Sequence, residues 1–308
     1  MNEAKTTGDF LSTIMATLGH APQQLTPGKF HRFGTRKAAW AKLFTDCMGG
    51  VFGDYRQGIS SHWSARDHQT PAELANMRRQ IQLAARERDA AQRIQWARNE
   101  ASNAALWAAA QPTGDAVHSY LAARGLGQWQ IPTVIRQHPG LDYWHTDDDG
   151  ELHKLGTFPA MLAPIVSTTG KLLAVHRTYL GDGKKADVPT PKKLTAAAGL
   201  LNGACIPLAS LRGGVIGVAE GIETAAAASL GSGLAVVAAY CANAMAGYQW
   251  PRNTERLVIF ADSDNAGQKA AASLAQRASQ SGLDTKTLTP SKPGSDWLDV
   301  LNEGTRHE

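Results

Sequence analysis

The sequence predicts an α/β fold with a mainly parallel, Rossmann-like sheet in the C-terminal domain, preceded by an α+β domain and a small β-rich module. Three observations support this prediction. Continuous apolar runs of strand length alternate with helical stretches after residue 214, which is typical of parallel sheets covered on both faces. An alanine-rich segment without glycine or proline, residues 72–110, precedes them. Short aromatic runs separated by glycines lie near the N-terminus.

Length and composition are compatible with several domains and exclude some classes of protein. The chain has 308 residues and 43% hydrophobic residues, enough for more than one core. A net charge of +4 favours a polyanionic partner only weakly. Cys47, Cys205 and Cys241 are far apart and suit a reducing compartment rather than a disulfide framework. Neither a signal peptide nor an apolar run of membrane-spanning length is present, so we expect a cytoplasmic protein without a membrane partner.

Residues 1–68 are predicted to form a small β-rich module, with antiparallel strands near 30–33, 40–46 and 51–55. Basic and aromatic residues interleave along these strands. Such a surface suits single-stranded nucleic acid, because charges follow the phosphates while rings stack on bases. The alternative is a half-buried sheet with its rings in a core and its charges in water. The candidate contacts are Arg32, Trp40, Lys42, Tyr55 and Arg56.

Residues 69–112 are predicted to be a helical linker, with one long helix or two between Pro71 and about Ala110. Thr70 can cap the N-terminus, and Pro71 suits the first helical position. Arginines recur on the exposed face, but acidic residues are interspersed with them. This mixture favours a solvated face over a nucleic-acid surface.

Residues 113–210 are predicted to form a basic α+β domain, with a helix at 115–124 and strands at 133–137, 159–166 and 172–180. A polar stretch containing glycine, proline and four lysines follows. Flexible basic loops of this kind commonly contact phosphates, although exposed loops are often rich in lysine without binding anything. The candidate contacts are Arg177, Lys184, Lys185, Lys192 and Lys193.

Residues 211–308 carry the α/β pattern. The predicted strands are 215–219, 234–239, 257–261 and 285–289, and the predicted helices lie near 223–231 and 266–280, with a final helix starting close to 296–299. Ligands of parallel α/β sheets bind outside the carboxyl ends of the strands. Residues that directly follow these strands are therefore the first candidates for a site.

Acidic residues occupy those positions. Glu220 follows the first strand, and Asp262 and Asp264 follow the third. These loops contain no matching lysine or arginine, so a divalent cation would neutralise the acids. Hard oxygen ligands suit Mg²⁺ or Mn²⁺ and metal-assisted phosphoryl chemistry. The alternative is that each acid is only a helix cap or a favourable charge at a helix N-terminus. Further candidate ligands are Glu223, Asp296 and Asp299.

Two motifs carry a resemblance to a known family. AEGIETAAAA and FADSDNAGQKAA resemble the Toprim domain of DnaG-type primases, type IA and II topoisomerases and several nucleases. Together with DWLDVLNEG, they are most similar to the Toprim primases of phages, plasmids and integrative elements. Upstream, HRTYLGDG, KKAD, PKKL and the stretch from FHRF to VFGDYRQGISSHWSA resemble other parts of those primases. The resemblance covers most of the chain outside the 70–110 helix and is strongest at 215–303.

The resemblance assigns roles to the acids. Glu220 matches the Toprim glutamate, which has acid/base or metal-binding roles, and Asp262 and Asp264 match the Asp-x-Asp metal ligands. DnaG-type primases have another acid three residues after the Glu-Gly pair. That position is Thr224 here, and Glu223 lies one place earlier. Glu223, Asp296 and Asp299 therefore compete as the additional ligand.

The resemblance implies a DNA primase, which makes short RNA primers on a single-stranded DNA template. Its substrates would be ribonucleoside triphosphates, and its chemistry would be phosphoryl transfer of the two-metal type. The sequence lacks the Cys/His set that binds zinc in DnaG-type primases, since Cys47 and His31 are too few. No structural zinc is expected, and template recognition would depend on the aromatic-basic module. No GxxxxGK[ST] motif is present, so a helicase partner would be a separate chain or a missing C-terminal extension.

Two other functions remain open at the level of the sequence. A metal-dependent Toprim nuclease would use the same acids. A topoisomerase would need a catalytic tyrosine on an additional domain, and we expect the chain to be too short to carry one. The other alternative, from a different functional class, is a single-stranded nucleic-acid-binding module with a vestigial acidic site.

Overall fold

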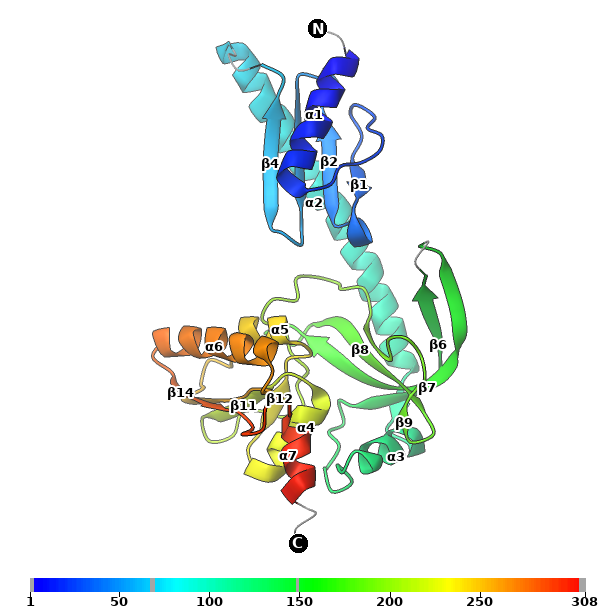
Figure 1. The fold of residues 1–308 in the computed structure, drawn as a ribbon, viewed down its shortest axis with the longest axis vertical. Helices are drawn as coiled ribbons and strands as arrows, with labels where there is room; N and C mark the ends of the chain where they lie inside the picture. Colours follow the sequence, from blue (N-terminus) through cyan, green and yellow to red (C-terminus); the bar gives the residue numbers. More distant parts are fainter. Residues whose placement is uncertain (1–2, 67–69, 148–149, 305–308) are drawn as a thin grey trace. The chain divides into compact units, whose positions relative to one another are not determined.

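The computed structural model describes residues 3–66, 70–147 and 150–304 (Figure 1). The chain divides into two compact units, Met1–Ile94 and Gln95–Glu308. Within the described ranges, no helix combines the length and the apolar character needed to cross a bilayer.

The first unit contains a four-stranded antiparallel sheet in the order β1-β2-β3-β4. The three predicted strands are confirmed. The fourth strand was not predicted, and neither was the N-terminal helix. The elements are α1 (Glu3–Leu18), β1 (His31–Phe33), η1 (Thr35–Lys37), β2 (Ala39–Leu43), β3 (Gly49–Asp54) and β4 (Ile59–Ser64).

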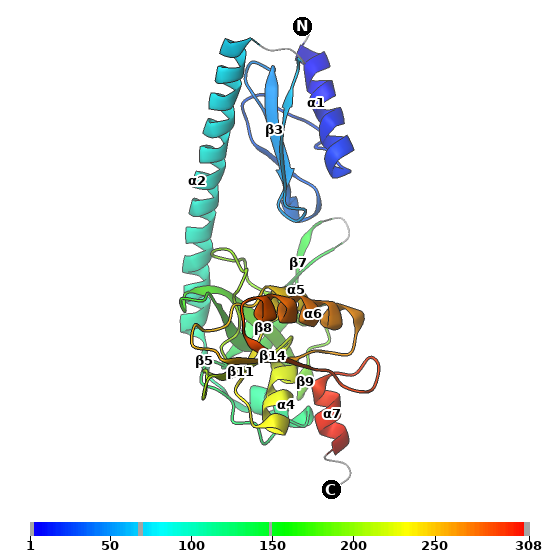
Figure 2. The same cartoon turned by 90° about the vertical axis from the view of Figure 1, so that its left-hand side faces the viewer.

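Helices cover both faces of this sheet (Figure 2). On α1, Phe10, Ile14 and Leu18 recur every four residues and pack with Phe52 in one core. The first half of α2 (Pro71–Ala109) covers the other face, where Ala84 packs in a second core with Trp40, Phe44 and Val51. The rings of the sheet are therefore largely used for packing.

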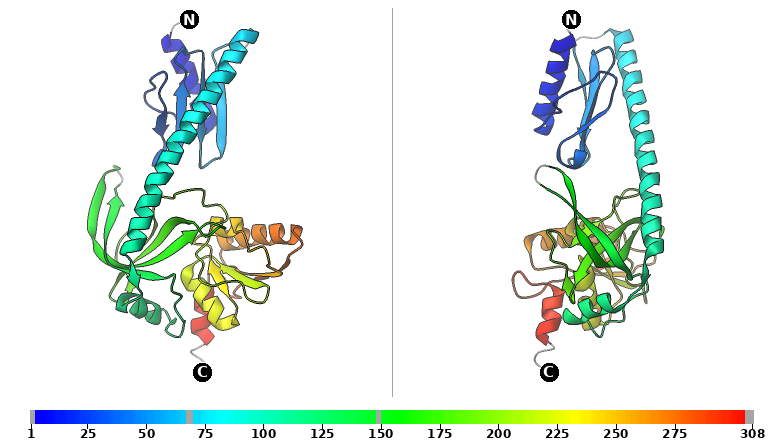
Figure 3. Two further views of the ribbon diagram at one scale, coloured as in Figure 1. Left: turned by 180° about the vertical axis from the view of Figure 1, so that it is seen from behind. Right: turned by 90° about the vertical axis from the view of Figure 1, so that its right-hand side faces the viewer.

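The long helix α2 is one unbroken element, as Figure 3 shows. Its N-terminus has a reciprocal cap: the backbone N–H and the hydroxyl of Thr70 each lie 2.8 Å from Glu73 Oε2, and the Glu73 N–H donates to the Thr70 hydroxyl. This capping box, followed by proline at the first helical position, explains why the helix begins at Pro71.

The second unit begins with an antiparallel sheet in the order β10-β8-β7-β6-β5, with β9 paired to β8. The predicted helix and the strands predicted at 159–166 and 172–180 are present, whereas the strand predicted at 133–137 begins only at Arg136, as β6. Strands β6 and β7, however, extend into a long hairpin that the sequence did not predict. The elements are β5 (Gln111–Pro112), α3 (Asp115–Ala123), β6 (Arg136–Thr146), β7 (Leu152–Val166), β8 (Leu172–Gly181), β9 (Lys184–Lys185) and β10 (Lys192–Leu194).

A four-stranded parallel sheet in the order β12-β11-β13-β14 completes the unit and confirms the predicted α/β pattern. Alternate residues of β11, β12 and β13 enter cores on opposite faces. α4 packs in one core and α5 and α6 in the other. The elements are β11 (Val215–Ala219), α4 (Ile222–Ser232), β12 (Val236–Ala238), α5 (Ala242–Gly247), β13 (Arg256–Phe260), α6 (Asn265–Gln280), β14 (Asp284–Leu288) and α7 (Trp297–Gly304). The short helix α5 was not predicted.

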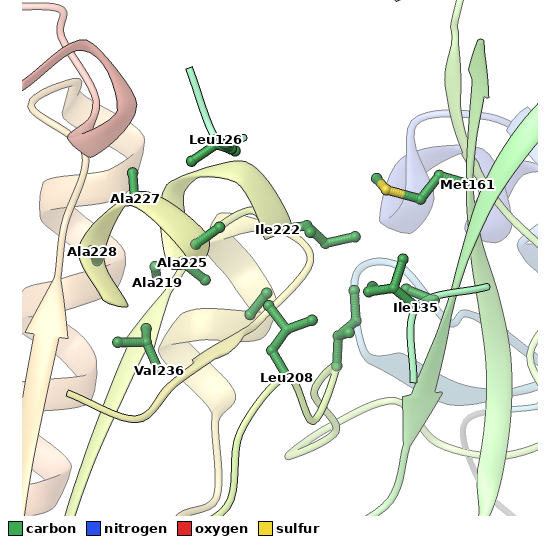
Figure 4. Packing of buried hydrophobic residues seen from close by; sticks show 14 of the residues in the cluster. Leu126, Ile135, Met161, Leu208, Ala219, Ile222, Ala225, Ala227, Ala228 and Val236 are labelled. Atoms are coloured by element: carbon green, nitrogen blue, oxygen red, sulfur yellow. The ribbon is translucent and has the colours of Figure 1, made fainter. Parts of the chain in front are cut away.

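Residues 205–206 link the two sheets of this unit. Cys205 bridges Val166 at the end of β7, and Ile206 bridges Ala238 at the end of β12. One hydrophobic core continues across the link, from Met161 on β7 to Ile222 on α4 (Figure 4). The antiparallel sheet is thereby packed against the parallel sheet on the side that α4 covers.

Candidate metal and nucleic-acid site

The carboxyl ends of β11 and β13 lie level at one edge of the parallel sheet. Ala219 and Phe260, the last residues of these neighbouring strands, are direct Cα partners. Glu220 follows the first strand, and Asp262 follows the second after one residue. The register therefore places at one edge two acids that are 42 residues apart in the sequence.

Asp262 stands in the least favourable electrostatic environment of these acids. Its Oδ1 is buried and has no hydrogen-bond partner within the described part of the chain. Burial raises its pKa to about 7, with repulsion from Glu220, Asp296, Asp264 and Asp299 adding to the shift. A carboxylate in this position is stable in its charged form only when a positive group approaches it.

Asp264 is the N-cap of α6. Its Oδ1 accepts a hydrogen bond from the Gly267 N–H at 2.7 Å. A Cβ on Gly267 would lie 3.0 Å from the Asp262 carbonyl oxygen, so the turn between the two aspartates is tightly packed. The cap predicted as an alternative role is thus present. It uses Oδ1 and leaves Oδ2 available for a further role.

Glu220 is half-buried at the same edge. Burial raises its pKa and the charge of Asp264 contributes, while a backbone hydrogen bond from Ala242 and the charge of Lys192 partly oppose the shift. Ala242 is the first residue of α5, which follows the neighbouring strand β12. Glu220 therefore lies near two negative side chains, Asp264 and Asp262, and beside the start of α5.

Ser263, between the two aspartates, fixes the loop in place. Its hydroxyl lies 2.8 and 3.0 Å from the Lys292 and Ser295 carbonyl oxygens, which share its single hydrogen, and accepts from the Ser295 N–H at 2.9 Å. Trp297 supports the strand end, with its Nε1–H 3.2 Å from the Ala261 carbonyl oxygen. Sequence reasoning missed both positioning residues. The serine in the Asp-x-Asp motif was a visible signal for the first.

The carboxylates of Asp296 and Asp299 accept hydrogen bonds from backbone N–H groups at the start of α7. Asp296 Oδ1 accepts from the N–H groups of Leu298 and Asp299, and Asp299 Oδ2 accepts from the Asp296 N–H at 3.1 Å. Both charges still act on Asp262, because they raise its pKa. These two acids therefore border the site while serving a structural purpose of their own.

Glu223 has a different environment from the other candidate ligands. It is 5% exposed, and its Oε1 accepts from the Tyr120 hydroxyl at 2.6 Å. Its Oε2 accepts from the Lys192 ammonium at 2.9 Å. The loops after β11 and β13 contain no matching lysine or arginine, as expected, but the fold brings Lys192 to Glu223 from β10 of the antiparallel sheet. No local pattern in the sequence indicates Tyr120.

The predicted phosphate contacts of the α+β domain divide into two groups. Arg177 donates to the Leu194 carbonyl oxygen at 2.8 Å, and Lys193 bonds to the Trp144 carbonyl oxygen and lies over the Tyr143 ring. Lys185 is half-buried, and burial lowers its pKa, with the nearby charge of Lys192 contributing. Lys192 and Lys185 therefore form a cationic pair next to the acids, and Lys184 is exposed beside them.

The aromatic-basic residues of the first unit are also unequal. Trp40 is 3% exposed and contacts Phe30 and the guanidinium of Arg88, so its ring is covered. Lys42 is paired with Glu87. Tyr55 is 48% exposed with Arg32 4.8 Å above its ring, and Arg56 is exposed next to it. Of the predicted contacts, Arg32, Tyr55 and Arg56 remain accessible.

The donor set at the sheet edge fits a hard divalent cation. In the described ranges, no three His, Cys, Asp or Glu side chains already stand at coordinating separation. The buried Oδ1 of Asp262 nevertheless lacks a partner amid four negative charges. Mg²⁺ in proteins uses one or two carboxylates and retains several waters, so it does not require a closed cage of side chains.

Comparisons with known proteins agree with this architecture. Residues 215–306 match a Toprim domain, and residues 97–206 match a domain of unknown function, DUF7146. The comparison with curated proteins finds no match.

Three solved structures resemble the chain. The DnaG primase catalytic domain bound to ssDNA has 15% identity and a TM-score of 0.47, covering 70% of this chain and 78% of that chain. The Aquifex aeolicus primase, with zinc-binding and RNA polymerase domains, has 13% identity and a TM-score of 0.40. The match covers 98% of this chain and 83% of that chain. The primase fragment of the bacteriophage T7 primase-helicase protein has 16% identity and a TM-score of 0.36. The match covers 61% of this chain and 66% of that chain.

At these identities and TM-scores, the structural similarities support no argument about activity. The match to the Toprim family rests on the sequence of residues 215–306 and coincides with the parallel sheet and its acidic edge. The C-terminal part of this chain is a Toprim domain.

Proposed function

We propose that the protein is a DNA primase, which synthesises short RNA primers on a single-stranded DNA template from ribonucleoside triphosphates. One observation carries the proposal most directly. The buried Asp262 oxygen has no partner and faces negative neighbours at the carboxyl edge of a Toprim sheet. That arrangement suits a cation-dependent phosphoryl-transfer site. The motif resemblance to primases of phages, plasmids and integrative elements favours a role in replicating or transferring a mobile element.

Glu220, Asp262 and Asp264 would hold Mg²⁺ or Mn²⁺. When bound, the metal supplies positive charge that stabilises the triphosphate and favours ionisation of a primer 3′-hydroxyl. Ser263 and Trp297 hold the loop that presents the aspartates. This rigidity matters because phosphoryl transfer depends mainly on positioning and on electrostatic stabilisation.

Basic residues near the acids would orient the polyanionic reactants. Lys192 and Lys185 lie close enough to influence each other's charge, and Asp296 acts on Lys185 as well. In the first unit, Arg32 with Tyr55 offers a cation and an exposed ring for single-stranded DNA. The proposed division of work is template contact by residues 1–68 and chemistry by residues 215–306.

Primer synthesis in vitro tests the proposal. The full chain is incubated with single-stranded DNA, labelled ribonucleotides and Mg²⁺ or Mn²⁺, and short RNA products are expected. Asp262→Ala should abolish synthesis and leave DNA binding largely intact. Asp284→Asn is the matched control, because Asp284 opens β14 at the opposite edge of the same sheet and pairs with Arg256.

The other outcomes are equally definite. Template cleavage without synthesis would assign the site to a nuclease. DNA binding with neither product would make the chain a binding module. Synthesis that survives in Asp262→Ala would overturn the assignment of the site.

A further inference from the structure

We infer that Glu223 is a positioning residue, which holds Lys192 beside the acidic edge of the Toprim sheet and ties α3 to α4 through Tyr120, and that it is not a metal ligand. The part of this inference that concerns nucleotide phosphates rests on the proposed function. The part that concerns metal binding does not.

Both oxygens of the Glu223 carboxylate already accept a hydrogen bond from a side chain. One oxygen accepts from Tyr120 on α3 at 2.6 Å, and the other accepts from Lys192 on β10 at 2.9 Å. The side chain is 6% exposed, so solvent does not compete with these partners. A metal would compete with these two donors for the same oxygens, and loss of the bond from Tyr120 would leave a buried hydroxyl unsatisfied.

The charge balance supports the same assignment. Burial opposes ionisation of Glu223, but the Lys192 ammonium and the Tyr120 hydroxyl outweigh it and hold the pKa at about 2. Glu223 and Lys192 thus form a neutral pair next to the unbalanced acids. Asp262 shows the opposite behaviour, since burial raises its pKa and neighbours of like sign add to the shift. One edge of the sheet therefore holds a satisfied acid and an unsatisfied one.

The contact with Glu223 fixes the position of the Lys192 ammonium. Its side chain is 38% exposed although its partner is buried, so the ammonium lies at the boundary between the core and the site. Its charge also acts on Glu220, which puts it near the acids that would hold the metal. Glu223 accepts one ammonium hydrogen, and two donors remain. Phosphate oxygens of a ribonucleoside triphosphate are the class of ligand that suits them.

The pair joins parts of the chain that are distant in sequence. Tyr120 precedes Glu223 by 103 residues and Lys192 precedes it by 31. Both come from the region that matches the domain of unknown function, whereas Glu223 belongs to the Toprim match. A buried ion pair contributes little net stability compared with a well-packed apolar pair, so stability alone is a weak reason for it.

Metal binding and nucleotide binding are measured separately on Glu223→Gln. Binding of Mn²⁺ alone, followed by electron paramagnetic resonance, is expected to stay within about threefold of the unchanged protein, whereas Asp262→Asn should weaken it at least about tenfold. Affinity for a ribonucleoside triphosphate with Mn²⁺, followed by calorimetry, should fall about tenfold in both Glu223→Gln and Lys192→Gln. The double variant should lose no more than either single one.

A surface pair of the same chemistry provides the control. Lys171 lies 2.8 Å from Glu100, and both side chains are about half exposed. Lys171→Gln and Glu100→Gln should change neither measurement. Tyr120→Phe keeps the ion pair and removes only the hydroxyl, so it should reduce nucleotide affinity less than Glu223→Gln does. It also provides a second variant if Glu223→Gln folds poorly by circular dichroism.

If the protein makes primers, the same variants should raise the KM for ribonucleotides about tenfold and change kcat less, which a purely structural role would not produce. Loss of Mn²⁺ affinity in folded Glu223→Gln would overturn the inference and make Glu223 a ligand. Nucleotide affinity unaffected by Lys192→Gln would also overturn it. Absence of primer synthesis in every variant, with both binding results as expected, would refute the proposed function alone.

Discussion

Asp262, which is half-buried, and His176, which is buried, have pKa values that move in opposite directions. Both shifts favour the neutral form of the side chain. Asp262 has a pKa of about 7 instead of 3.8 because burial and negative neighbours disfavour its charge. His176 is 7% exposed and has a pKa of about 4 instead of 6.5, chiefly because of burial. Each shift links protonation to the free energy of unfolding, with opposite signs.

Asp262 is expected to make the protein less stable as pH rises from about 4 to 7 when metal is absent. In that window the folded state retains a proton that the unfolded state has already released, so a rising pH favours unfolding. In EDTA, Asp262→Asn should remove this loss and gain about 2 kcal/mol at pH 7.5, a value discounted for the partial exposure of the side chain. Urea unfolding at several pH values measures it.

Saturating Mg²⁺ provides the contrast for Asp262. A bound cation would stabilise the ionised carboxylate, so the difference between Asp262→Asn and the unchanged protein should shrink or reverse in sign. Equal pH profiles for the two proteins in EDTA would contradict the assigned environment of Asp262.

His176 is expected to act in the opposite direction. Between pH 6.5 and about 4 the unfolded chain binds a proton that the buried ring does not, so stability falls as pH falls through this window. His176→Gln should flatten that part of the profile, by about 2 to 3 kcal/mol at pH 4. The groups that act on the ring are Glu223, Lys192 and Arg177. Urea unfolding from pH 7 to 4 checks it, and an unchanged slope would refute it.

At the residue scale, the sequence predicted the positions of the acids better than their partners. Glu220 and Asp262 could be placed because a strand pattern fixes which residue follows the last apolar position. Glu223 could be placed at a helix start for the same reason. Its partners could not, because Tyr120 and Lys192 reach it only through tertiary packing. Trp40 was a candidate nucleic-acid contact, with a ring in the core as the alternative, and the structure has the alternative, since aromatic residues on a small sheet suit either place.

At the element scale, prediction succeeded where periodicity was strong. The strands at 215–219 and 257–261 and the helix from Pro71 match the structure closely. α1 was missed, since Thr6, Thr7 and Gly8 are weak helix formers and its packing on the sheet is a tertiary interaction that the sequence does not reveal. The hairpin of β6 and β7 was missed because Pro139 and Gly140 interrupt its pattern, and the structure accommodates them at a register shift.

Gly53 on β3 is expected to tolerate no side chain. A Cβ there would lie 2.2 Å from the Ile59 carbonyl oxygen and 2.8 Å from the Trp40 ring, so strand and core would both have to move. Gly53→Ala should therefore destabilise the first unit by about 3 kcal/mol. Urea unfolding followed by Trp fluorescence measures this.

Gly8 on α1 is the matched control for Gly53. It has no atom within 4 Å of an added Cβ and lies inside a helix. Gly8→Ala should stabilise the protein by about 0.5 to 1 kcal/mol, because alanine loses less backbone entropy in a helix. A neutral Gly53→Ala would show that β3 and β4 are not paired as described.

At the scale of the whole molecule, the two compact units have separate hydrophobic cores. Phe10, Phe52 and Trp40 belong to cores of the first unit, and Tyr120 and Phe260 belong to the largest core of the second. The proposed metal site lies entirely in the second unit. Units with separate cores can unfold as separate cooperative transitions, so a ligand of one need not stabilise the other.

Mg²⁺ is therefore expected to protect one unit only. A ligand that binds the folded state stabilises it by about 2.7 kcal/mol at a hundredfold excess over Kd. Hydrogen exchange followed by mass spectrometry should slow in the peptides that cover 215–223 and 256–267 and stay unchanged in those that cover 39–64. Asp262→Ala should abolish the protection, and Gly53→Ala should leave it intact while accelerating exchange in 39–64. Mg²⁺ protection that spreads equally over both ranges would mean that the chain unfolds as a single cooperative unit, and protection that survives in Asp262→Ala would place the metal elsewhere.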